Sequence, residues 1–264
     1  MKVAEIGDNC IDLYERLDRK YTTGNVVDTG VNLKKLGAEV SIISTTGSDE
    51  NGKWMIESLR SEGLDISHLK VAEGPTAVTY MDMIGNDRVH GDYVEGVLAD
   101  MVFDEEDIRF ACTHDLVHSA LWGMAEKALP KIAASGTPVA FDYADRLDHP
   151  LVEETLPYVS YGFYSYHHGR DAFIEEFLKD KVDRGMKIAV ATFGEEGSLA
   201  YDKDGFHEGK IVPAKEVVNT VGAGDSFIAG FLYGILSGWS VEECLQKGAE
   251  VASAVVQVFE PWVS

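Results

Sequence analysis

Residues 219–232 read NTVGAGDSFIAGFL, in which three small residues stand directly before an acid and an apolar segment. The pattern predicts an extended segment over 217–221, a tight turn over 222–224 and a helix over 226–236 that Asp225 opens. The first N–H groups of a helix have no partner inside it and lie at the positive end of its dipole. Because the turn carries no bulky side chain, an anion can approach these groups closely. We therefore predict an anion hole here that can hold a phosphate.

Asp225 lies in the first turn of the predicted helix. A carboxylate beside an anion hole can accept the proton of an attacking hydroxyl, and the helix dipole favours its ionised form. Phosphoryl transfer needs both features, because the transferring group carries negative charge. Taken alone, the motif also fits an ordinary turn followed by a favourable first-turn acid. The catalytic residues predicted here are Gly222, Ala223, Gly224 and Asp225.

Short apolar segments alternate with amphipathic segments along the rest of the chain. Strands are predicted at 3–6, 40–45, 116–119, 139–142, 161–165 and 188–192. Helices are predicted near 25–36, 50–62, 124–134 and 169–183. A capping box at 240–243 starts a last helix. This alternation predicts a mainly parallel sheet with helices on both faces and with ligands at the carboxyl ends of its strands.

Residues 77–94 break this pattern. The segment 77–84 alternates weakly, 85–87 have the composition of a turn, and 88–94 would form the returning strand. We predict a β-hairpin that projects from the α/β body and serves as a lid. Because the chain has no linker-like stretch or repeat, a single domain is expected over 1–264, with the lid formed by parts of 9–25 and 75–98.

The bulk composition excludes several classes of protein. The formal net charge of −22 disfavours nucleic acid as a partner, and bound ATP would need local positive groups or Mg²⁺. No apolar stretch approaches the ~20 residues that cross a bilayer, and the N-terminus lacks a signal-peptide pattern, so we expect a soluble, cytoplasmic protein. Neither a disulfide framework nor a zinc site is indicated, because the cysteines are scattered and the His167-His168 doublet lacks a third ligand.

The 219–232 segment is similar to the C-terminal signature of the PfkB/ribokinase family of carbohydrate kinases, and the similarity continues along the chain. Other segments that resemble motifs of this family are GDNCID at 7–12, TGNVVD at 23–28, GSDENG at 47–52 and TFGEEG at 192–197. Within the family, the chain resembles kinases that phosphorylate the 6-hydroxyl of a sugar–amine adduct. That likeness is carried by residues 6–12, 64–68, 86–100, 117–123 and 222–232.

The resemblance implies a fold and a set of roles. The fold would be a ribokinase-like α/β sandwich with a small β lid, and the activity would be that of an ATP-dependent phosphotransferase with an alcohol group as acceptor. Asp225 would be the base and the 222–225 turn the anion hole, while Asp12, Asn25 and Asp28 would hold the sugar. Mg²⁺ would bridge the phosphates, a monovalent cation is allowed, and a homodimer through the lid is expected. The nucleotide side would be formed by Thr192, Gly194, Gly197 and Thr220.

The sequence also departs from the family pattern. Thr23 replaces the first glycine of a Gly-Gly pair, Asp28 replaces an asparagine, and Asn219 replaces the aspartate that opens the signature. Glu260-Pro261 stands where a Gly-Ala pair is expected. The N-x-x-E motif tied to Mg²⁺ and phosphate should fall near Ser165–His168 but is absent there, so the metal ligands are unassigned.

An acidic segment points to the kind of substrate. Nine of the residues 82–107 are acidic, and Arg88 is the one lysine or arginine among them. Together with Asp28, carboxylates such as Asp92 would attract an ammonium group, although such segments are more often solvated surface. Arg88 would meet a substrate carboxylate or the phosphate, or pair with a neighbouring acid.

Three alternatives remain open from the sequence. The same machinery would serve a kinase for another ketose or keto-sugar acid, or a nucleoside kinase. A non-catalytic ligand-binding protein on the same fold is the third, and the missing N-x-x-E motif is its support. If the protein is a kinase of any of these kinds, its partner is a small molecule.

Overall fold

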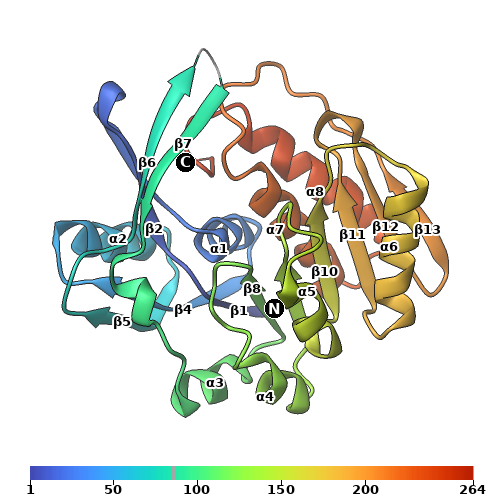
Figure 1. Cartoon of the computed structure of the whole chain (residues 1–264), viewed down its shortest axis with the longest axis horizontal. Coiled ribbons are helices and arrows are strands. Elements are labelled where there is room, and N and C mark those ends of the chain that lie inside the picture. Colours follow the sequence, from blue (N-terminus) through green and yellow to red (C-terminus); the bar gives the residue numbers. More distant parts are fainter. Residues whose placement is uncertain (85–86, 264) are drawn as a thin grey trace.

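The computed structural model describes residues 1–84 and 87–263, without the side chains of 84, 87 and 88. Its centre is a nine-stranded sheet in the order β13–β12–β11–β10–β9–β8–β1–β4–β5 (Figure 1). The strand pairs from β5 to β11 are parallel, whereas β12 and β13 are antiparallel, which confirms the predicted mainly parallel sheet. The strands are β1 (Lys2–Ile6), β4 (Glu39–Gly47), β5 (Asp65–Ala72), β8 (Leu116–Ala120), β9 (Val139–Asp142), β10 (Tyr161–Ser165), β11 (Ile188–Thr192), β12 (Ser198–Asp202) and β13 (Gly205–Gly209).

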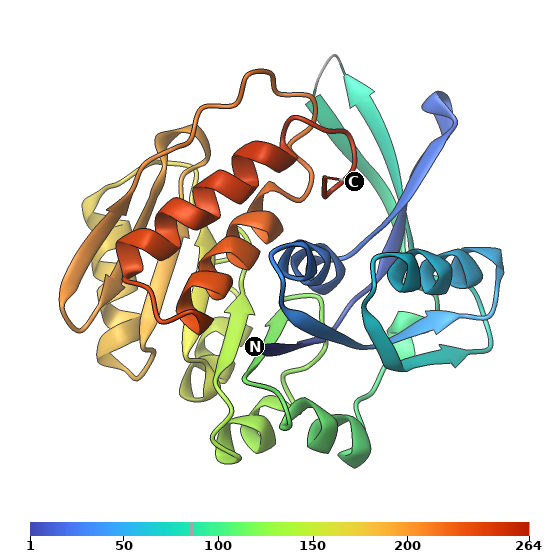
Figure 2. The same ribbon diagram turned by 180° about the vertical axis from the view of Figure 1, so that it is seen from behind.

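Helices cover both faces of this sheet, as the alternation predicts (Figures 1 and 2). Successive strand residues point to opposite faces, so Val3 lies in one hydrophobic core and Ala4 in the other. The first core is covered by α1 (Asn25–Lys35), α2 (Glu50–Ser61), α7 (Ala223–Leu236) and α8 (Val241–Val255). The second is covered by α3 (Glu105–Ala111), α4 (Leu129–Ala134), α5 (Pro150–Thr155) and α6 (Ala172–Asp183). No described helix is long and apolar enough to cross a membrane.

A second sheet projects from this body beside α1 (Figure 1). Its order is β3 (Arg19–Thr23), β2 (Cys10–Tyr14), β6 (Val78–Ile84) and β7 (Asp87–Val94). The predicted hairpin is confirmed, since β6 and β7 are antiparallel neighbours, although two residues of its predicted turn, 85 and 86, lie outside the described part. That this sheet closes over a site as a lid stays a prediction.

The predicted starts of two helices are wrong. The first, α7, begins at Ala223, earlier than expected, and the segment 217–221 before it belongs to no strand. The segment is instead tied to the C-terminal region, where Asn219 donates from Nδ2 to the carbonyl of Phe259. The helix expected near 124–134 begins only at Leu129, because Met124 has a left-handed φ of 53° and Pro130 fits only the first turn of a helix.

Candidate active site

Asp225 lies in the first turn of α7, where three distant parts of the chain meet. The side-chain amide of Asn25, the first residue of α1, donates from Nδ2 to Asp225 Oδ1 at 3.1 Å. The same Nδ2 lies 3.5 Å from Oδ2 of Asp142, the last residue of β9. Burial and the neighbouring charge of Asp142 raise the pKa of Asp225 to about 8. The ionised carboxylate is therefore a stronger proton acceptor than an ordinary aspartate.

The glycines before Asp225 play different parts. Gly222 caps α7 with a left-handed φ of 70°, and a Cβ there would lie 2.8–2.9 Å from Pro261. Gly224 is exposed, and a Cβ at this position would meet no atom within 4 Å. Backbone and packing therefore require Gly222, whereas they do not require Gly224. The glycine at 224 leaves open space in front of the first N–H groups of α7, as close approach of an anion needs.

Further carboxylates gather around Asp225. Asp8 Oδ2 accepts from the backbone N–H of Asn25 at 3.0 Å, and Asp28 Oδ2 accepts from Thr23 Oγ1 at 2.7 Å. Asp8 Oδ1 and Asp28 Oδ1 are enclosed and have no hydrogen-bond partner among the described residues. Burial, followed by the charge of Asp225, raises the pKa of Asp28 well above its ordinary value. We call Asp8, Asp12, Asp28, Asp142 and Asp225 the acidic cluster.

The predicted sugar-binding residues are only partly brought together. Asn25 and Asp28 surround Asp225, and Asp12, buried on β2, is an electrostatic neighbour of Asp28. Asp92 is exposed on β7, and the contacts described for the cluster do not include it. Arg88 lies on β7 opposite Met83, with its side chain outside the described part of the structure.

Three of the four residues predicted for the nucleotide side, Thr192, Gly194 and Gly197, lie at the carboxyl end of β11. Asp142, Ser165 and Thr192 end three consecutive parallel strands, and Ser165 is paired with Thr192 in register. Gly194 and Gly197 form the turn that follows β11, and a Cβ at Gly194 would meet no atom within 4 Å. Thr220 is exposed and precedes Gly222, and its carbonyl accepts from the N–H of Ala223.

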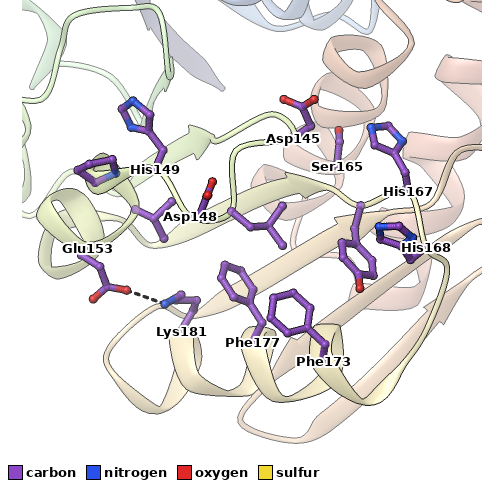
Figure 3. Close-up of a pocket in the computed structure, with 14 residues that line it drawn as sticks. Asp145, Asp148, His149, Glu153, Ser165, His167, His168, Phe173, Phe177 and Lys181 are labelled. Carbon is purple, nitrogen blue, oxygen red and sulfur yellow. Dashed lines mark hydrogen bonds and ion pairs between the residues drawn. The ribbon is translucent and has the colours of Figure 1, made fainter.

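A cavity of about 680 Å³ opens beside the ends of β9 and β10 (Figure 3). It is lined by Ser165, His167 and His168, where the N-x-x-E motif is missing, and by Asp145 on the facing loop. The acidic cluster does not line it. Among the described residues, no group of three or more His, Cys, Asp and Glu side chains is placed to hold a metal ion. Carboxylate oxygens suit Mg²⁺, and one or two carboxylates of the acidic cluster would be enough to contact it. Most of its ligands would then be phosphates and water, as is usual for nucleotide-bound Mg²⁺.

Sequence reasoning missed two members of the acidic cluster. Asp8 falls inside the GDNCID segment, next to Gly7, and Asp142 is the last residue of a correctly predicted strand. A signal existed for Asp142, because an acid at the carboxyl end of a parallel strand stands where ligands bind in α/β folds. The buried pair Glu5 and His118 was also missed, since nothing in either strand marks the two as partners.

Comparison with known proteins identifies the family of the chain. Residues 19–261 match the model of a family described as pfkB family carbohydrate kinase. A fructoselysine 6-kinase of Escherichia coli (strain K12) is 38% identical over 260 residues, which cover 98% of this chain and 99% of that protein. A fructosamine kinase of Bacillus subtilis (strain 168) is 30% identical over 264 residues, covering 98% of this chain and 92% of that protein.

Among solved structures, a ribokinase of Arabidopsis thaliana in complex with ribose and ATP superposes with a TM-score of 0.84. The match covers 97% of this chain and 92% of that chain at 20% sequence identity, so it bears on the fold. It confirms the ribokinase-like sandwich expected from the sequence. The family match and the two similar kinases confirm the resemblance drawn from the motifs. The chain belongs to the pfkB family of carbohydrate kinases, phosphotransferases that act on a sugar hydroxyl.

Proposed function

We propose that this protein uses ATP to phosphorylate the 6-hydroxyl of fructoselysine, a sugar–amine adduct, with Asp225 as the base. The observation that carries the proposal is the position of Asp225. Its carboxylate is held by Asn25, has a raised pKa, and lies in the first turn of α7 beside the open space at Gly224. A hydroxyl beside Asp225 would meet a proton acceptor and a phosphate held in that space at the helix end.

The chemical step follows from this placement. The proton of the 6-hydroxyl passes to the carboxylate of Asp225 as the hydroxyl oxygen bonds to the γ-phosphorus of ATP. The bond between that phosphorus and the oxygen bridging it to the β-phosphate breaks, and ADP leaves with the electron pair. The N–H groups of Gly224 and Asp225 stabilise the charge that develops on the phosphoryl oxygens. The N–H of Ala223, which donates to the carbonyl of Thr220 in the free protein, would join them by exchanging that contact for a phosphoryl oxygen.

On the nucleotide side, we assign Thr192, Gly194, Gly197 and Thr220 to ATP. Gly194 leaves open space at the end of β11, and Thr220 leads directly into the Gly222 turn. Bound Mg²⁺ would supply positive charge to the phosphates, which this acidic chain otherwise provides through helix N–H groups. Asn219 uses Nδ2 for Phe259 and Oδ1 for the N–H of Val221, so in this proposal it stabilises the turn and is not a cation ligand.

The acidic cluster favours an amine-bearing acceptor. Buried carboxylates repel one another, and the unpartnered oxygens of Asp8 and Asp28 lack a donor. An ammonium group would supply both the opposite charge and the hydrogen bonds, whereas a neutral hexose supplies hydrogen bonds alone. The two similar kinases are named for fructoselysine and fructosamine, which supports the same substrate class.

Two secondary proposals accompany the activity. Exposed apolar side chains on β6 and β7, among them Tyr80, Val89 and Val94, suit a homodimer through the four-stranded sheet. Light scattering should then give twice the chain mass of 28.9 kDa. A cytoplasmic location stays a prediction.

The direct test of the proposed substrate is ADP release, measured with purified protein, ATP and Mg²⁺. Fructoselysine, fructose, a keto-sugar acid and a nucleoside would be compared at equal concentrations. We expect the highest kcat/KM with fructoselysine. A higher value with fructose or a nucleoside would show that the acceptor is misassigned, and the absence of ADP release with every acceptor would favour a binding protein.

A further inference from the structure

A pair of ionisable side chains lies buried inside the sheet beneath the acidic cluster. Glu5 of β1 and His118 of β8 are register neighbours on adjacent parallel strands. His118 Nδ1 lies 2.6 Å from Glu5 Oε2, and both side chains are 0% exposed. Glu5 Oε1 and His118 Nε2 have no hydrogen-bond partner among the described residues. A buried pair of this kind needs a reason, because apolar residues of similar volume often give equal or higher stability.

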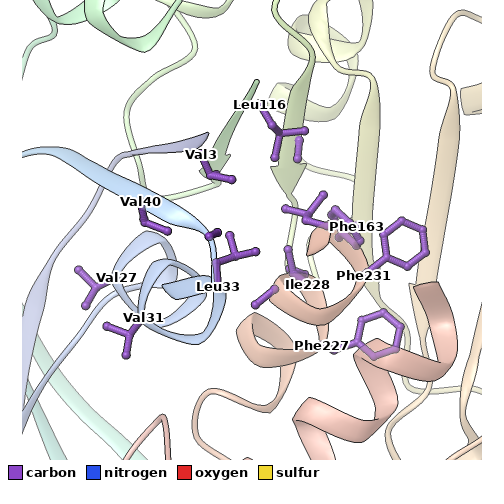
Figure 4. Close-up of a cluster of buried hydrophobic side chains, with 14 of the residues drawn as sticks. Val3, Val27, Val31, Leu33, Val40, Leu116, Phe163, Phe227, Ile228 and Phe231 are labelled. Atoms are coloured by element: carbon purple, nitrogen blue, oxygen red, sulfur yellow. The ribbon is translucent and has the colours of Figure 1, made fainter. Parts of the chain in front are cut away.

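The pair points toward the helices that carry the site. Val3 and Leu116, two residues earlier on the same strands, pack in the core with Ile228 of α7 (Figure 4). Because strand residues alternate between faces, Glu5 and His118 point to this same face, nearer the carboxyl ends of the strands. Glu5 lies directly under α1, where a Cβ at Gly30 would come within 3.1 Å of its Cγ.

The strand beside β8 leads from this pair to the base. His118 is paired in register with Ala140 of β9, and Asp142 follows two residues later on the same face. Asp142 in turn contacts the amide of Asn25, which holds Asp225. His118 thus lies two residues below the level of Asp142, which is one of the carboxylates near the base.

The charges that face Asp225 come from several elements. Asp142 of β9, Asp8 after β1 and Asp28 of α1 are carboxyl groups whose pKa is raised, mainly by burial, and His118 of β8 is a basic group that faces them. Each negative neighbour disfavours the ionised form that a general base needs, whereas a positive charge favours it. Burial lowers the pKa of His118, but the charge and hydrogen bond of Glu5 outweigh it, so that pKa is raised.

We infer that His118, paired with Glu5, is a positioning residue that carries a positive charge beneath the acidic cluster and keeps Asp225 in its proton-accepting form. This inference rests on the proposed role of Asp225. Glu5 holds His118 in its charged form, and the charge on His118 offsets part of the repulsion that Asp142 and Asp8 exert on Asp225. Neither residue touches the acceptor.

The first test needs no activity. The full-length protein, labelled with ¹⁵N-histidine, is titrated by NMR, and the His118 signals are identified by their loss in His118→Gln. We expect an imidazolium at neutral pH and, in Asp225→Asn, a lower pKa of His118, since linkage between the two charges is reciprocal. A neutral His118 at neutral pH in the wild type would overturn the inference, as would a His118 pKa unchanged by Asp225→Asn.

The second test measures kcat against pH. His118→Gln should move the acid limb of the profile to higher pH by about half a unit or more. An opposite charge in direct contact shifts a pKa by about 1–3 units, and His118 acts on Asp225 without touching it, so a smaller shift is expected. Glu5→Gln should act in the same direction, and the double variant should shift no further than His118→Gln, since the pair acts as a unit. An unmoved limb in His118→Gln would overturn the inference.

His207→Gln is the matched control, because His207 also lies between carboxylates, Asp202 at 2.9 Å and Glu242 at 2.7 Å, on the edge strand β13. It should leave the profile unchanged, and an equal shift there would show that the effect of His118→Gln is not specific to the pair. If Asp225→Asn keeps wild-type turnover, the proposed base is wrong, and the NMR result still decides whether His118 and Asp225 influence each other. If His118→Gln does not fold, the other seven histidines, assigned by single substitutions, identify the His118 signals by elimination.

Discussion

The amide of Asn25 donates a hydrogen bond to the carboxylate of Asp225 at 3.1 Å, although the two residues are 200 positions apart in the chain. Each is in the first turn of its helix, α1 or α7, and these helices lie side by side on one face of the sheet (Figure 2). The contact fixes the direction in which the carboxylate points. It also brings α1, to which the proposal assigns the sugar, against the first turn of α7, to which it assigns the phosphate.

The pH dependence of kcat/KM should report Asp225 in the free protein. Burial and Asp142 raise its pKa to about 8, so the ionised base is scarce at neutral pH. We expect kcat/KM to fall by about tenfold per unit of pH below about pH 8. Fructose is the control acceptor, because it has no amine to titrate and should show the same limb. A flat profile with both acceptors between about pH 6 and about pH 8 would contradict the assignment of this pKa to the base.

As the pH rises, the contribution of Asp225 to the free energy of unfolding should fall, whereas kcat/KM should rise. The pKa of Asp225 is higher in the folded protein than the ordinary value of 3.8, so the folded state holds its proton more tightly than the unfolded state. The resulting stabilisation is complete below about pH 4 and is lost as the pH rises through about 8. Asp225→Asn should therefore raise the free energy of unfolding at about pH 8 by at least ~1 kcal/mol, and by less at about pH 5.

Chemical denaturation at both pH values measures this change. Asp204→Asn, at an exposed position, should leave the free energy of unfolding nearly unchanged at each pH. A loss of stability in Asp225→Asn at about pH 8 would mean that the carboxylate supports the fold and that its charge is not under strain.

The two glycines of the turn should separate folding from catalysis. Gly222→Ala places a side chain against Pro261 at a left-handed φ, and we expect a loss of ~1–3 kcal/mol in stability. Gly224→Ala meets no atom and lies inside α7, so stability should hold or rise by up to ~1 kcal/mol. Its methyl group would instead occupy the space assigned to phosphate, and kcat/KM for ATP should fall by at least ~10-fold. Full activity in Gly224→Ala would contradict the anion hole.

Asp28 should select between amine-bearing and neutral acceptors. Asp28→Asn keeps the shape of the side chain and removes its ability to ionise beside a bound ammonium group, while its Oδ2 contact with Thr23 can be kept by the amide oxygen. We expect kcat/KM for fructoselysine to fall by at least ~10-fold more than that for fructose, because a charge-assisted hydrogen bond is lost with only one of them. Asp92→Asn, exposed on β7, is the comparison variant. An unchanged ratio of the two kcat/KM values would rule out Asp28 as the selecting group.

Local patterns predicted much of the fold. The apolar segments that became β8, β9, β10 and β11 are short, buried and bounded by turn residues, so their sequences alone mark them as strands. In contrast, β12 and β13 were not predicted. β13 contains two glycines and a glutamate, β12 ends in an aspartate, and both strands depend on pairing, β12 with β11 and β13 with β12. Residues 217–221 join no sheet, since their hydrogen bonds go to the C-terminal segment, and the sequence of 217–221 does not show these partners.

The sequence predicts only part of the candidate site. Asp225 and the turn before it carry their chemistry in adjacent residues, and a sequence pattern can show that. The contacts of Asp225 with Asn25 and of His118 with Glu5 arise only when α1, α7 and the strands pack together. Asp142 is an intermediate case, since its position at the end of a strand was predictable but its neighbours were not.

The most direct test of the central claim is the turnover of Asp225→Asn, measured as ADP release with saturating fructoselysine, alongside ATP binding by calorimetry. We expect ATP binding to remain close to that of the wild type, because the N–H groups of α7 are unchanged. Turnover should fall by at least ~10²-fold, the low end for the loss of an acid–base group. Near wild-type turnover in a variant that binds ATP normally would contradict the account.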